Sequence, residues 1–398
     1  MGKNTGKKCH IGLMEPMLPE ASRVGPLRER AAELLSAASG LTARLHPIVS
    51  TQIGGLVRTM NCYYSNLIEG HNTHPRDIER ALAEHYSSDP VKRDLQLEAK
   101  AHIAVQDAID AEERPFNVSV EYIQCLHAAF YQHLPEAFLT ASNPDTGEIL
   151  RVEPGQLRQS WVQVGRHIPP GPEELPKFMQ RFSNCYTWDD RNVLDGVIAA
   201  AASHHRFLWI HPFLDGNGRV ARLFSDAFLK TLGVGSCLWS VSRGLARHVD
   251  TYKAKLADAD SERRGDLDGR GQLSLQGLIN FCEFFMDTCL DQISFMDTLI
   301  QPATLLSRIE FYVAQQQHHK QLPKQAFPLL KEALLMGEFE RGQAAALTGY
   351  QERQARTVLQ ALIEKKLLVS DSPRGKVRLN FSAETAEYWL PKLFPPKD

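Results

Sequence analysis

The sequence predicts a mainly α-helical protein that ends in a small winged helix-turn-helix domain. Apolar residues recur at spacings of three and four along most of the chain, which is the period of an amphipathic helix. β-Branched residues seldom alternate with polar ones, so few strands are expected. Residues 322–398 change to a compact succession of a helix, a helix-turn-helix and a hairpin. A chain of 398 residues has room for two or three domains of about 150 residues each.

The composition is that of an ordinary globular protein, with 43% hydrophobic and 23% charged residues. Seven scattered cysteines, never in Cys-x-x-Cys spacing, predict neither a disulfide framework nor a zinc site. No apolar run approaches the roughly 18 residues of a membrane span, so we expect a cytoplasmic protein without a membrane partner. The net charge of -2 conceals an asymmetry, because residues 301–398 hold 14 basic against 10 acidic side chains.

The helical period is clearest in six stretches of the first 232 residues. These stretches are 27–47, 92–111, 119–134, 172–187, 192–208 and 216–232. One stretch departs from the helical period: residues 157–168, LRQSWVQVGRHI, lie between Pro154-Gly155 and Pro169-Pro170. We therefore predict a short β-hairpin at 157–168.

The C-terminal region predicts the elements of a winged helix in order. A helix over 326–336 precedes a short helix that Gly349 should end, and an amphipathic basic helix follows. Two β-rich arms then surround the turn Pro373-Arg374-Gly375. The second helix of the turn and the wing carry Arg353, Arg356, Lys365, Lys366, Arg374, Lys376 and Arg378. This basic surface could contact DNA, or it could serve for docking or for homo-oligomer formation.

The segment His211-Pro-Phe-Leu-Asp-Gly-Asn-Gly-Arg219 combines the groups that a triphosphate site needs. Gly216 and Gly218 let the backbone approach an anion closely, and the helix that starts here directs its positive N-terminal end at that anion. Asn217 can add a side-chain donor, and Phe213 is expected to anchor the loop in the core.

The charged residues of the same segment suit the rest of the chemistry. Asp215 is the only carboxylate in the loop and is a suitable ligand for Mg2+. Arg219 and Arg222 are three residues apart, so they share a helix face and can both hold phosphates. His211 precedes Pro212, which should keep it extended, and its imidazole can accept a proton near neutral pH.

A Gly-Asn turn before a helix has a purely structural interpretation when it occurs alone. Here nine positions match the active-site signature of the Fic family, His-Pro-Phe-x-Asp/Glu-Gly-Asn-Gly-Arg, and a further Arg follows three residues later. The chain therefore resembles Fic proteins, which implies a helical Fic core with a small β-hairpin flap. It also implies an enzyme that transfers AMP from ATP to Ser, Thr or Tyr hydroxyls of a target protein and of itself.

The resemblance assigns a role to each residue that matches the signature. His211 would deprotonate the target hydroxyl, and Asp215 would bind Mg2+. The α- and β-phosphates of ATP would be held by Gly216, Asn217 and Gly218, and the distal phosphates by Arg219 and Arg222. The hairpin predicted at 157–168 lies where the family carries its flap, so Val162, Val164 and Gly165 are candidates for target binding.

A second motif, Ser65-Asn-Leu-Ile-Glu69-Gly70, lies upstream. Gly70 is a typical helix stop, which leaves Glu69 at the negative end of the helix dipole, where an acid needs a cationic partner or water. The motif resembles the inhibitory motif of Fic proteins, Ser/Thr-x-x-x-Glu-Gly/Asn. That resemblance implies that Glu69 pairs with Arg222 and blocks the γ-phosphate. In some relatives the same Glu positions a water for removal of AMP.

We divide the chain into an N-terminal helical region (1–115) with an inhibitory helix at about 55–70, a Fic core (116–260), a helical connector (261–321) and a winged-helix domain (322–398). Protein adenylyltransferase is the favoured function. Two alternatives stay open: a Fic enzyme that transfers UMP, phosphate or phosphocholine, or removes AMP, and a DNA-binding regulator whose Fic pocket senses a nucleotide.

Overall fold

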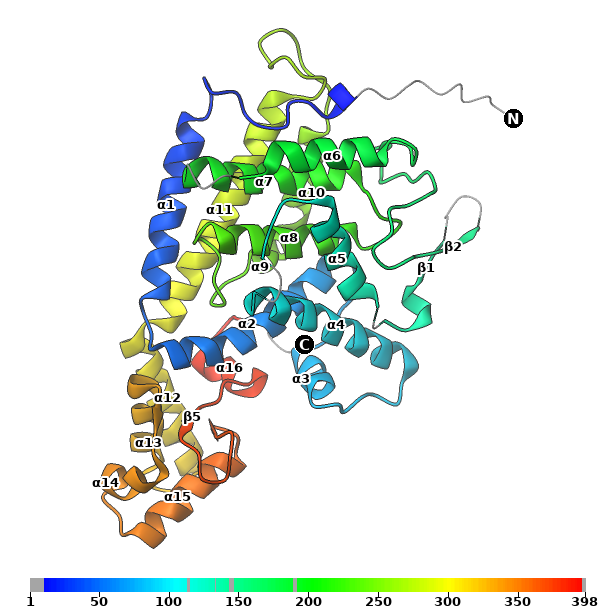
Figure 1. Ribbon diagram of the computed structural model, residues 1–398. Helices are drawn as coiled ribbons and strands as arrows, with labels where there is room; N and C mark the ends of the chain where they lie inside the picture. The colour runs from blue at the N-terminus through cyan, green and yellow to red at the C-terminus, as the bar shows by residue number, and fades with distance from the viewer. Residues whose placement is uncertain (1–10, 113–114, 133, 143–146, 189–191, 396–398) are drawn as a thin grey trace.

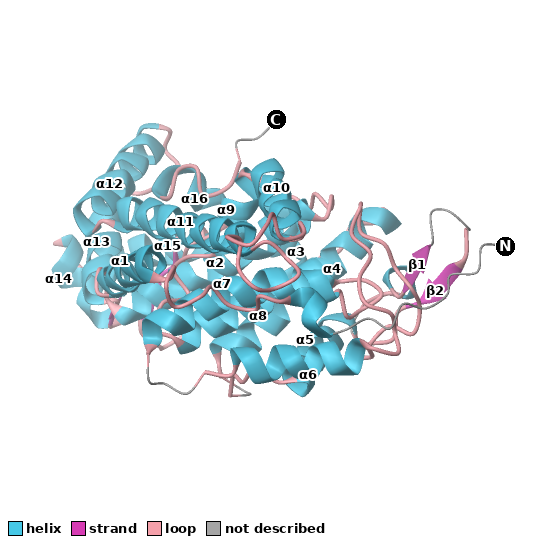
Figure 2. Ribbon diagram, turned by 90° about the horizontal axis from the view of Figure 1, so that it is seen from above, coloured by secondary structure: helices cyan, strands magenta, loops and turns pink. Residues whose placement is uncertain are grey.

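The computed structural model describes residues 11–112, 115–132, 134–142, 147–188 and 192–395. The described chain is mostly helical, as the sequence predicts. Figure 1 shows a large helical body and, at its lower end, a smaller group of elements from the C-terminal part of the chain. Helices also dominate the view from above, where the short strands β1 and β2 lie at one edge (Figure 2). None of the helices in the described ranges has the length and apolar character needed to cross a membrane.

The body contains the helices up to α11. Their bounds are α1 (Gly25–Thr42), α2 (Pro47–Ile68), α3 (Pro75–Leu82), α4 (Pro90–Asp110), α5 (Val120–Tyr131), α6 (Leu175–Tyr186), α7 (Val193–Ile210), α8 (Asn217–Thr231), α9 (Val241–Arg247), α10 (Val249–Ala259) and α11 (Leu275–Ile300). Short 3-10 turns lie at Ile11–Met14, Glu136–Phe138 and Arg341–Gln343.

The centre of the body is the antiparallel pair α7 and α8, with α11 and α1 packed on the outer side of α7. Four consecutive alanines of α7, residues 199–202, are buried, and their small side chains let neighbouring helices approach closely. Asn192 begins α7 by accepting backbone N–H groups with its side chain. The loop between α7 and α8 is the predicted triphosphate loop, so two packed helices fix both of its ends.

The prediction of a β-hairpin at 157–168 is wrong, because this segment does not form two paired strands. Only one backbone pair forms there, between Val164 and His167, and it closes a two-residue turn. The backbone N–H of Arg158 instead bonds to Pro212 O, and Trp161 and Ile168 are largely exposed, so no buried face favours a longer ladder. The antiparallel pair of this region lies upstream, between β1 (Thr140–Ser142) and β2 (Ile149–Arg151).

The C-terminal elements follow the predicted order, and the structure adds a strand after the first predicted helix and a helix after the predicted hairpin. They are α12 (Pro302–His318), α13 (Ala326–Met336), β3 (Glu338–Phe339), α14 (Ala344–Thr348), α15 (Glu352–Glu364), β4 (Leu368–Val369), β5 (Val377–Leu379) and α16 (Ala383–Trp389). Gly349, with a φ of 68°, ends α14 as predicted. Strand β3 joins the predicted hairpin to give a three-stranded antiparallel sheet in the order β3-β5-β4. The sequence analysis did not predict β3 or α16.

One buried cation fastens the N-terminal segment to the body. Arg206 of α7 is completely buried, and its guanidinium donates to Pro16 O at 2.8 and 3.1 Å and to Ala259 O at 3.3 Å. The same group contacts the ring of His205 at 2.7 Å. Burial lowers the pKa of Arg206, which reflects the cost of holding this charge away from water.

We predict that Arg206→Ala lowers the free energy of unfolding by about 3 kcal/mol, because it leaves buried carbonyl groups without donors and opens a cavity. Urea denaturation followed by circular dichroism measures this. Arg28→Ala is the control, because Arg28 forms an ion pair with Asp195 that is exposed to solvent and should contribute little to stability. Equal effects of the two substitutions would contradict the structural role of Arg206.

Candidate active site

The triphosphate loop begins with an unusual backbone conformation at His211. This residue has φ 50° and ψ 61°, and its N–H donates to Phe207 O at 3.0 Å. His211 is therefore a left-handed C-cap of α7, and the expectation that Pro212 would hold it extended is wrong. The pairing with Phe207 at the helix end outweighs the usual restriction before proline.

The middle of the loop is held by Asn217. Its Oδ1 accepts from Phe213 N and its Nδ2 donates to Phe213 O, both at 2.9 Å. Phe213 is fully buried and stacks on the ring of His127 at 3.9 Å, which anchors the loop in the core as expected. One of the two Nδ2 hydrogens of Asn217 is thus bonded within the loop. The main structural role of this side chain is to fix the conformation of the loop.

Helix α8 starts within the motif, at Asn217, and its first turn is tightly enclosed. Gly216 has φ 78°, and a Cβ there would lie 2.6 Å from the ring of Tyr131. A Cβ on Gly218 would collide with Oε1 of Glu69. The Glu69 carboxylate therefore lies against the N-terminal turn of α8, where the helix dipole and free N–H groups favour an anion.

Arg222 joins this carboxylate to α8. Its Nη2 lies 2.6 Å from Glu69 Oε1, its Nε donates to Ser65 Oγ at 2.9 Å, and its Nη2 also donates to Ser65 O at 3.1 Å. Arg222 is buried, whereas the Glu69 side chain is 32% exposed. Gly70, with a φ of 89°, ends the preceding helix α2 and leaves Glu69 at its C-terminal cap.

The charge of Glu69 is set by opposing effects. Burial favours the neutral carboxyl, but the positive charges of Arg222 and Arg219 outweigh burial, so the pKa of Glu69 is lowered. At neutral pH Glu69 is therefore an anion beside the two arginine side chains.

Arg219 is held by partners that the sequence analysis missed. Its Nη1 forms an ion pair with Glu98 of α4, a carboxylate with no exposed surface, and its guanidinium lies 5.1 Å from the ring of Phe130. Glu98 also accepts from Nδ1 of His71 at 2.8 Å, and this hydrogen bond raises the pKa of His71. An acid at position 98 on the apolar face of a predicted helix was the available signal, because buried acids need a partner.

Asp215 is also fixed by a residue from another helix. Tyr131 donates to its Oδ2 at 2.8 Å, and Arg219 Nη2 lies 3.3 Å from the same oxygen. Burial favours the neutral acid, but Arg219 and the Tyr131 hydrogen bond outweigh it and lower the pKa of Asp215. Within the described ranges no group of three His, Cys, Asp or Glu side chains could hold a metal ion alone. A lone ionised carboxylate suits Mg2+, which takes its other oxygens from phosphate and water.

Comparison with known proteins agrees with this geometry. Residues 117–229, which run from the start of α5 to the end of α8, match the Fic/DOC family. The chain contains a Fic domain. All the residues of the triphosphate loop lie within this domain, whereas Glu69 and Glu98 precede it.

Curated relatives share part of this chain. A protein adenylyltransferase Fic of Nematostella vectensis is 31% identical over 171 residues, which are 43% of this chain and 37% of the relative. A protein of the same name from Drosophila mojavensis is 42% identical over 87 residues, or 22% of this chain and 17% of the relative. The matched segments thus make up well under half of these relatives.

Solved structures of Fic proteins share the fold. A Fic family protein from Desulfovibrio desulfuricans has a TM-score of 0.50 at 17% identity, and the match covers 89% of this chain and 97% of that one. Fic-1 of C. elegans has a TM-score of 0.53 at 16% identity over 70% and 74% of the two chains. At this identity the likeness concerns the fold alone.

The segment 157–168 is fastened to the start of the Fic loop. Arg158 donates through Nε to His211 O at 2.8 Å, and His167 Nε2 lies 2.7 Å from Trp209 O. Val162 lies half-buried next to Trp161, which is 67% exposed and packs over Gly171, while Val164 and Gly165 lie exposed at the turn. Apolar side chains are therefore presented to solvent beside His211.

The imidazole of His211 is neutral at physiological pH. Burial, helped by the charge of Arg158, lowers the pKa of His211 to about 4. A neutral imidazole is the form that can accept a proton from a hydroxyl group.

We predict that His211 stays neutral until the pH falls to about 4, and that Arg158→Met raises its pKa, because a nearby positive charge that opposes protonation is removed. NMR titration of the His211 ring measures both values. Arg166→Met is the control, because Arg166 lies exposed at the turn of the same segment. A His211 titration near 6.5 in the wild type would contradict the buried, positively charged environment described for this ring.

Proposed function

We propose that this protein is an autoinhibited protein adenylyltransferase. It transfers AMP from ATP, in the presence of Mg2+, to a Ser, Thr or Tyr hydroxyl of a target protein and of itself. The observation that carries the proposal is the Glu69–Arg222 ion pair at the N-terminal turn of α8, inside a complete Fic loop. Curated relatives named protein adenylyltransferase Fic support the same reaction.

The reaction follows from the positions of the loop residues. His211 accepts the proton of the target hydroxyl, whose oxygen then forms a bond to the α-phosphorus of ATP. The bond from the α-phosphorus to the oxygen that bridges it to the β-phosphate breaks, and pyrophosphate leaves. The α- and β-phosphates are held by the backbone at Gly216 and Gly218 and by the Nδ2 hydrogen of Asn217 that does not bond to Phe213. The first turn of α8 favours anions at this position.

The remaining charges of the triphosphate face the two arginines and Asp215. Arg219 and Arg222 neutralise the distal phosphates, and Asp215 would hold Mg2+, which would supply further positive charge to the departing pyrophosphate. Catalysis of this kind depends on positioning and charge stabilisation, so the tight fixation of Arg219 by Glu98 and of Asp215 by Tyr131 serves the reaction directly.

Inhibition follows from competition for Arg222. The Glu69 carboxylate holds the guanidinium and lies over Gly218, so it occupies the place that the γ-phosphate needs. ATP that binds beside Glu69 cannot align its α-phosphate with the attacking hydroxyl. Ser65 supports the inhibited arrangement, because it fixes the other side of the same guanidinium.

The target protein binds across segment 157–168. Its side chains at the turn, with Val164 and Gly165 exposed and Val162 half-buried beside them, can contact an extended peptide of the target. The anchoring of this segment through Arg158 keeps that peptide close to His211.

The main prediction concerns self-labelling with ATP that carries 32P at the α-position. Glu69→Gly should raise the rate about 10- to 100-fold, because a charge-assisted hydrogen bond of about 1.5–3 kcal/mol no longer holds Arg222 away from the nucleotide. His211→Ala in the Glu69→Gly background should abolish labelling, because no base remains. Incorporated label after gel electrophoresis is the measurement.

Glu84→Gly is the matched control, because Glu84 is an exposed glutamate whose backbone has φ 62° and so accepts glycine without strain. Labelling that is equal in wild type, Glu69→Gly and the double variant would refute the proposal. Stronger labelling with UTP that carries 32P at the α-position than with the labelled ATP would favour transfer of another nucleotide. Loss of label from modified protein without ATP would indicate AMP removal.

A further inference from the structure

The C-terminal elements present a surface that the transfer reaction does not use. We propose that α15 and the β4–β5 turn bind double-stranded DNA. Helices α14 and α15 are joined by only three residues, 349–351, and the positive φ of Gly349 permits the sharp turn. In a helix-turn-helix the second helix enters the major groove, and in this chain α15 holds that position.

The outer face of α15 carries side chains suited to reading base pairs. Its buried side faces the sheet and α13 through Ala355, Val358, Leu359 and Leu362. The opposite side is exposed and includes Arg353, Arg356, Thr357 and Gln360, which recur at three- and four-residue spacing. In this structure Gln360 Nε2 donates to Glu364 Oε1 at 3.1 Å. Arginine pairs with guanine and glutamine with adenine in the major groove, and threonine contacts either a base or a phosphate.

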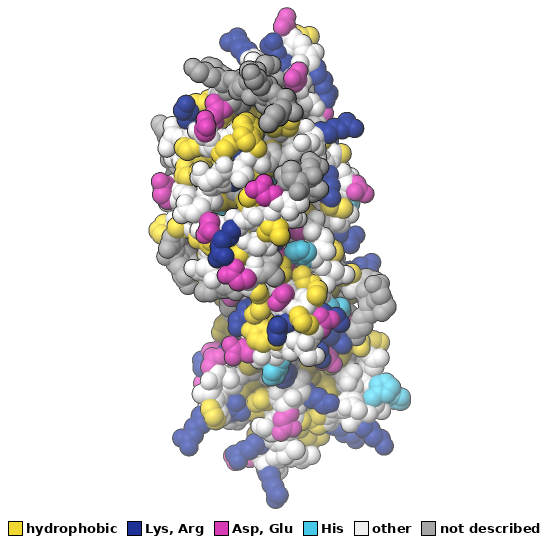
Figure 3. Space-filling view, turned by 90° about the vertical axis from the view of Figure 1, so that its right-hand side faces the viewer, with side chains coloured by type: hydrophobic (Ala, Val, Ile, Leu, Met, Phe, Trp, Pro, Cys, Tyr) yellow, Lys and Arg dark blue, Asp and Glu magenta, His cyan; other side chains and the backbone are white. Residues whose placement is uncertain are grey.

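The positive charge of this face is available to a ligand. Arg353, Arg356 and Arg374 are exposed and have no carboxylate partner among the residues that the structure describes. Lys376 and Arg378, by contrast, are paired with Glu338 and Asp371. Figure 3 shows Lys and Arg side chains projecting from the lower end of the molecule, where Figure 1 places α14 and α15.

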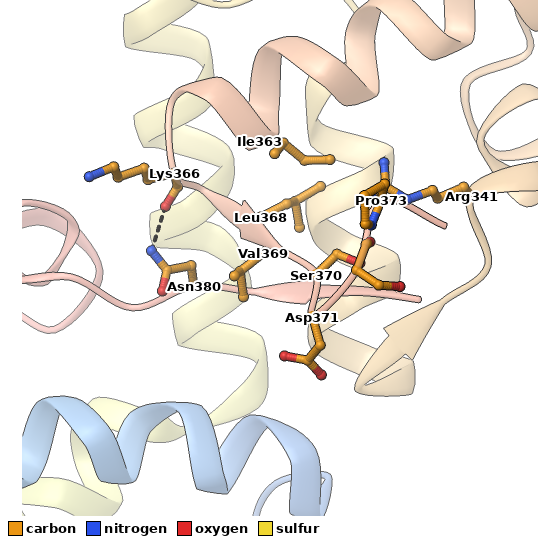
Figure 4. Close-up of a pocket in the computed structure, with 10 residues that line it drawn as sticks. Arg341, Ile363, Lys366, Leu368, Val369, Ser370, Asp371, Pro373 and Asn380 are labelled. Carbon is orange, nitrogen blue, oxygen red and sulfur yellow. Dashed lines mark hydrogen bonds between the residues drawn. The ribbon is translucent and has the colours of Figure 1, made fainter. Parts of the chain in front are cut away.

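The β4–β5 turn extends the same surface beyond the helix. Between this turn and the C-terminal end of α15 lies a hollow of about 490 Å3, and Figure 4 shows Arg341 and Lys366 on opposite sides of it. Arg374 lies exposed at the tip of the turn. A duplex with its major groove on α15 would bring its phosphate backbone to these cations, as in other winged helices.

The test is fluorescence anisotropy of a labelled 25-base-pair duplex of mixed sequence, titrated with the full chain at several salt concentrations. We expect binding that weakens as salt rises, with a non-specific dissociation constant on the order of 10⁻⁴–10⁻⁶ M at physiological salt. The double variant Arg353→Ala/Arg356→Ala should bind at least about tenfold more weakly, with a shallower salt dependence.

Lys92→Ala/Arg93→Ala is the matched control, because these are two exposed basic residues on α4, far from α15 in sequence. It should bind DNA like the wild type. Equal melting temperatures of all three proteins establish that the variants are folded. Absence of binding at low salt, or equal losses in both double variants, would overturn the proposal, as would self-association through α15 without DNA binding.

A second and independent observation concerns residues 392–394 and the helix that carries Glu69. Tyr64 of α2 donates to Leu393 O at 3.4 Å, and the rings of Tyr63 and Phe394 meet edge to face at 6.4 Å. Arg243 of α9 donates to Lys392 O at 2.9 Å and lies over the ring of Tyr64. Residues 392–394 are thus clamped onto α2 immediately before Ser65.

We infer that this C-terminal clamp, residues 392–394 on α2, keeps Glu69 in the inhibitory position. Ser65 follows Tyr64 directly and holds Arg222, so loosening the clamp shifts the residues that bind the guanidinium. Helix α16, which leads into the clamp, packs against α12 and α3. The inference rests on the proposed function, since it concerns the same Glu69–Arg222 pair.

Leu393→Ala tests the clamp, because Leu393 is fully buried and its truncation leaves a cavity next to α2. Self-labelling should rise about 2- to 30-fold in the wild-type background and should not change in Glu69→Gly, where the inhibitory contact is already absent. Leu359→Ala is the control, a buried leucine of α15 that does not belong to the clamp.

Hydrogen exchange of α2 gives a readout that does not depend on activity. Backbone amides near Ser65 should exchange faster in Leu393→Ala than in Leu359→Ala. Unchanged exchange would overturn the clamp whatever the labelling shows. If Glu69→Gly is active but Leu393→Ala labels like the wild type, the clamp fails and the proposed function stands. If Glu69→Gly is inactive while exchange rises, the proposed function fails and the mechanical link to α2 stands.

Discussion

The ion pair between Arg222 and Glu69 is the interaction on which the site depends. A buried guanidinium must have acceptors, and in this structure Ser65 and Glu69 of the α2 end supply them. The site at the start of α8 is therefore built for an anion and already contains one of its own. Under the proposed function, a phosphate that enters it must replace the carboxylate, which couples the conformation of α2 to occupancy of the loop.

The second arginine obeys the same constraint with different partners. Arg219 contacts Glu98, Asp215 and the face of Phe130. His71 donates a hydrogen bond to the same Glu98 carboxylate. Two helices that precede the Fic domain thus position both arginines of its motif. The Fic fold supplies the loop, and the N-terminal helices determine where the positive charges point.

Helix α2 also connects the site to the C-terminal elements. Its last turns hold Arg222, its tyrosines contact residues 393 and 394, and its N-cap His46 lies against Gly337 at the end of α13. One helix therefore contacts both the anion site and the part of the chain that presents α15. This arrangement gives a physical route by which events at the C-terminal surface could reach Glu69, because packed helices move as units.

The sequence by itself determined the features that depend on neighbours along the chain. These include the helical character, the continuous loop of residues 211–219, the stop at Gly70, and the helix-turn-helix around Gly349. Family resemblance added the pairing of Glu69 with Arg222, which the geometry contains. Tertiary structure alone decided the left-handed His211, the missing strands at 157–168, and the recruitment of Glu98, His71 and Tyr131. The physical reason is that burial and hydrogen bonding between distant segments fix these residues, and no local pattern records which helix will lie opposite them.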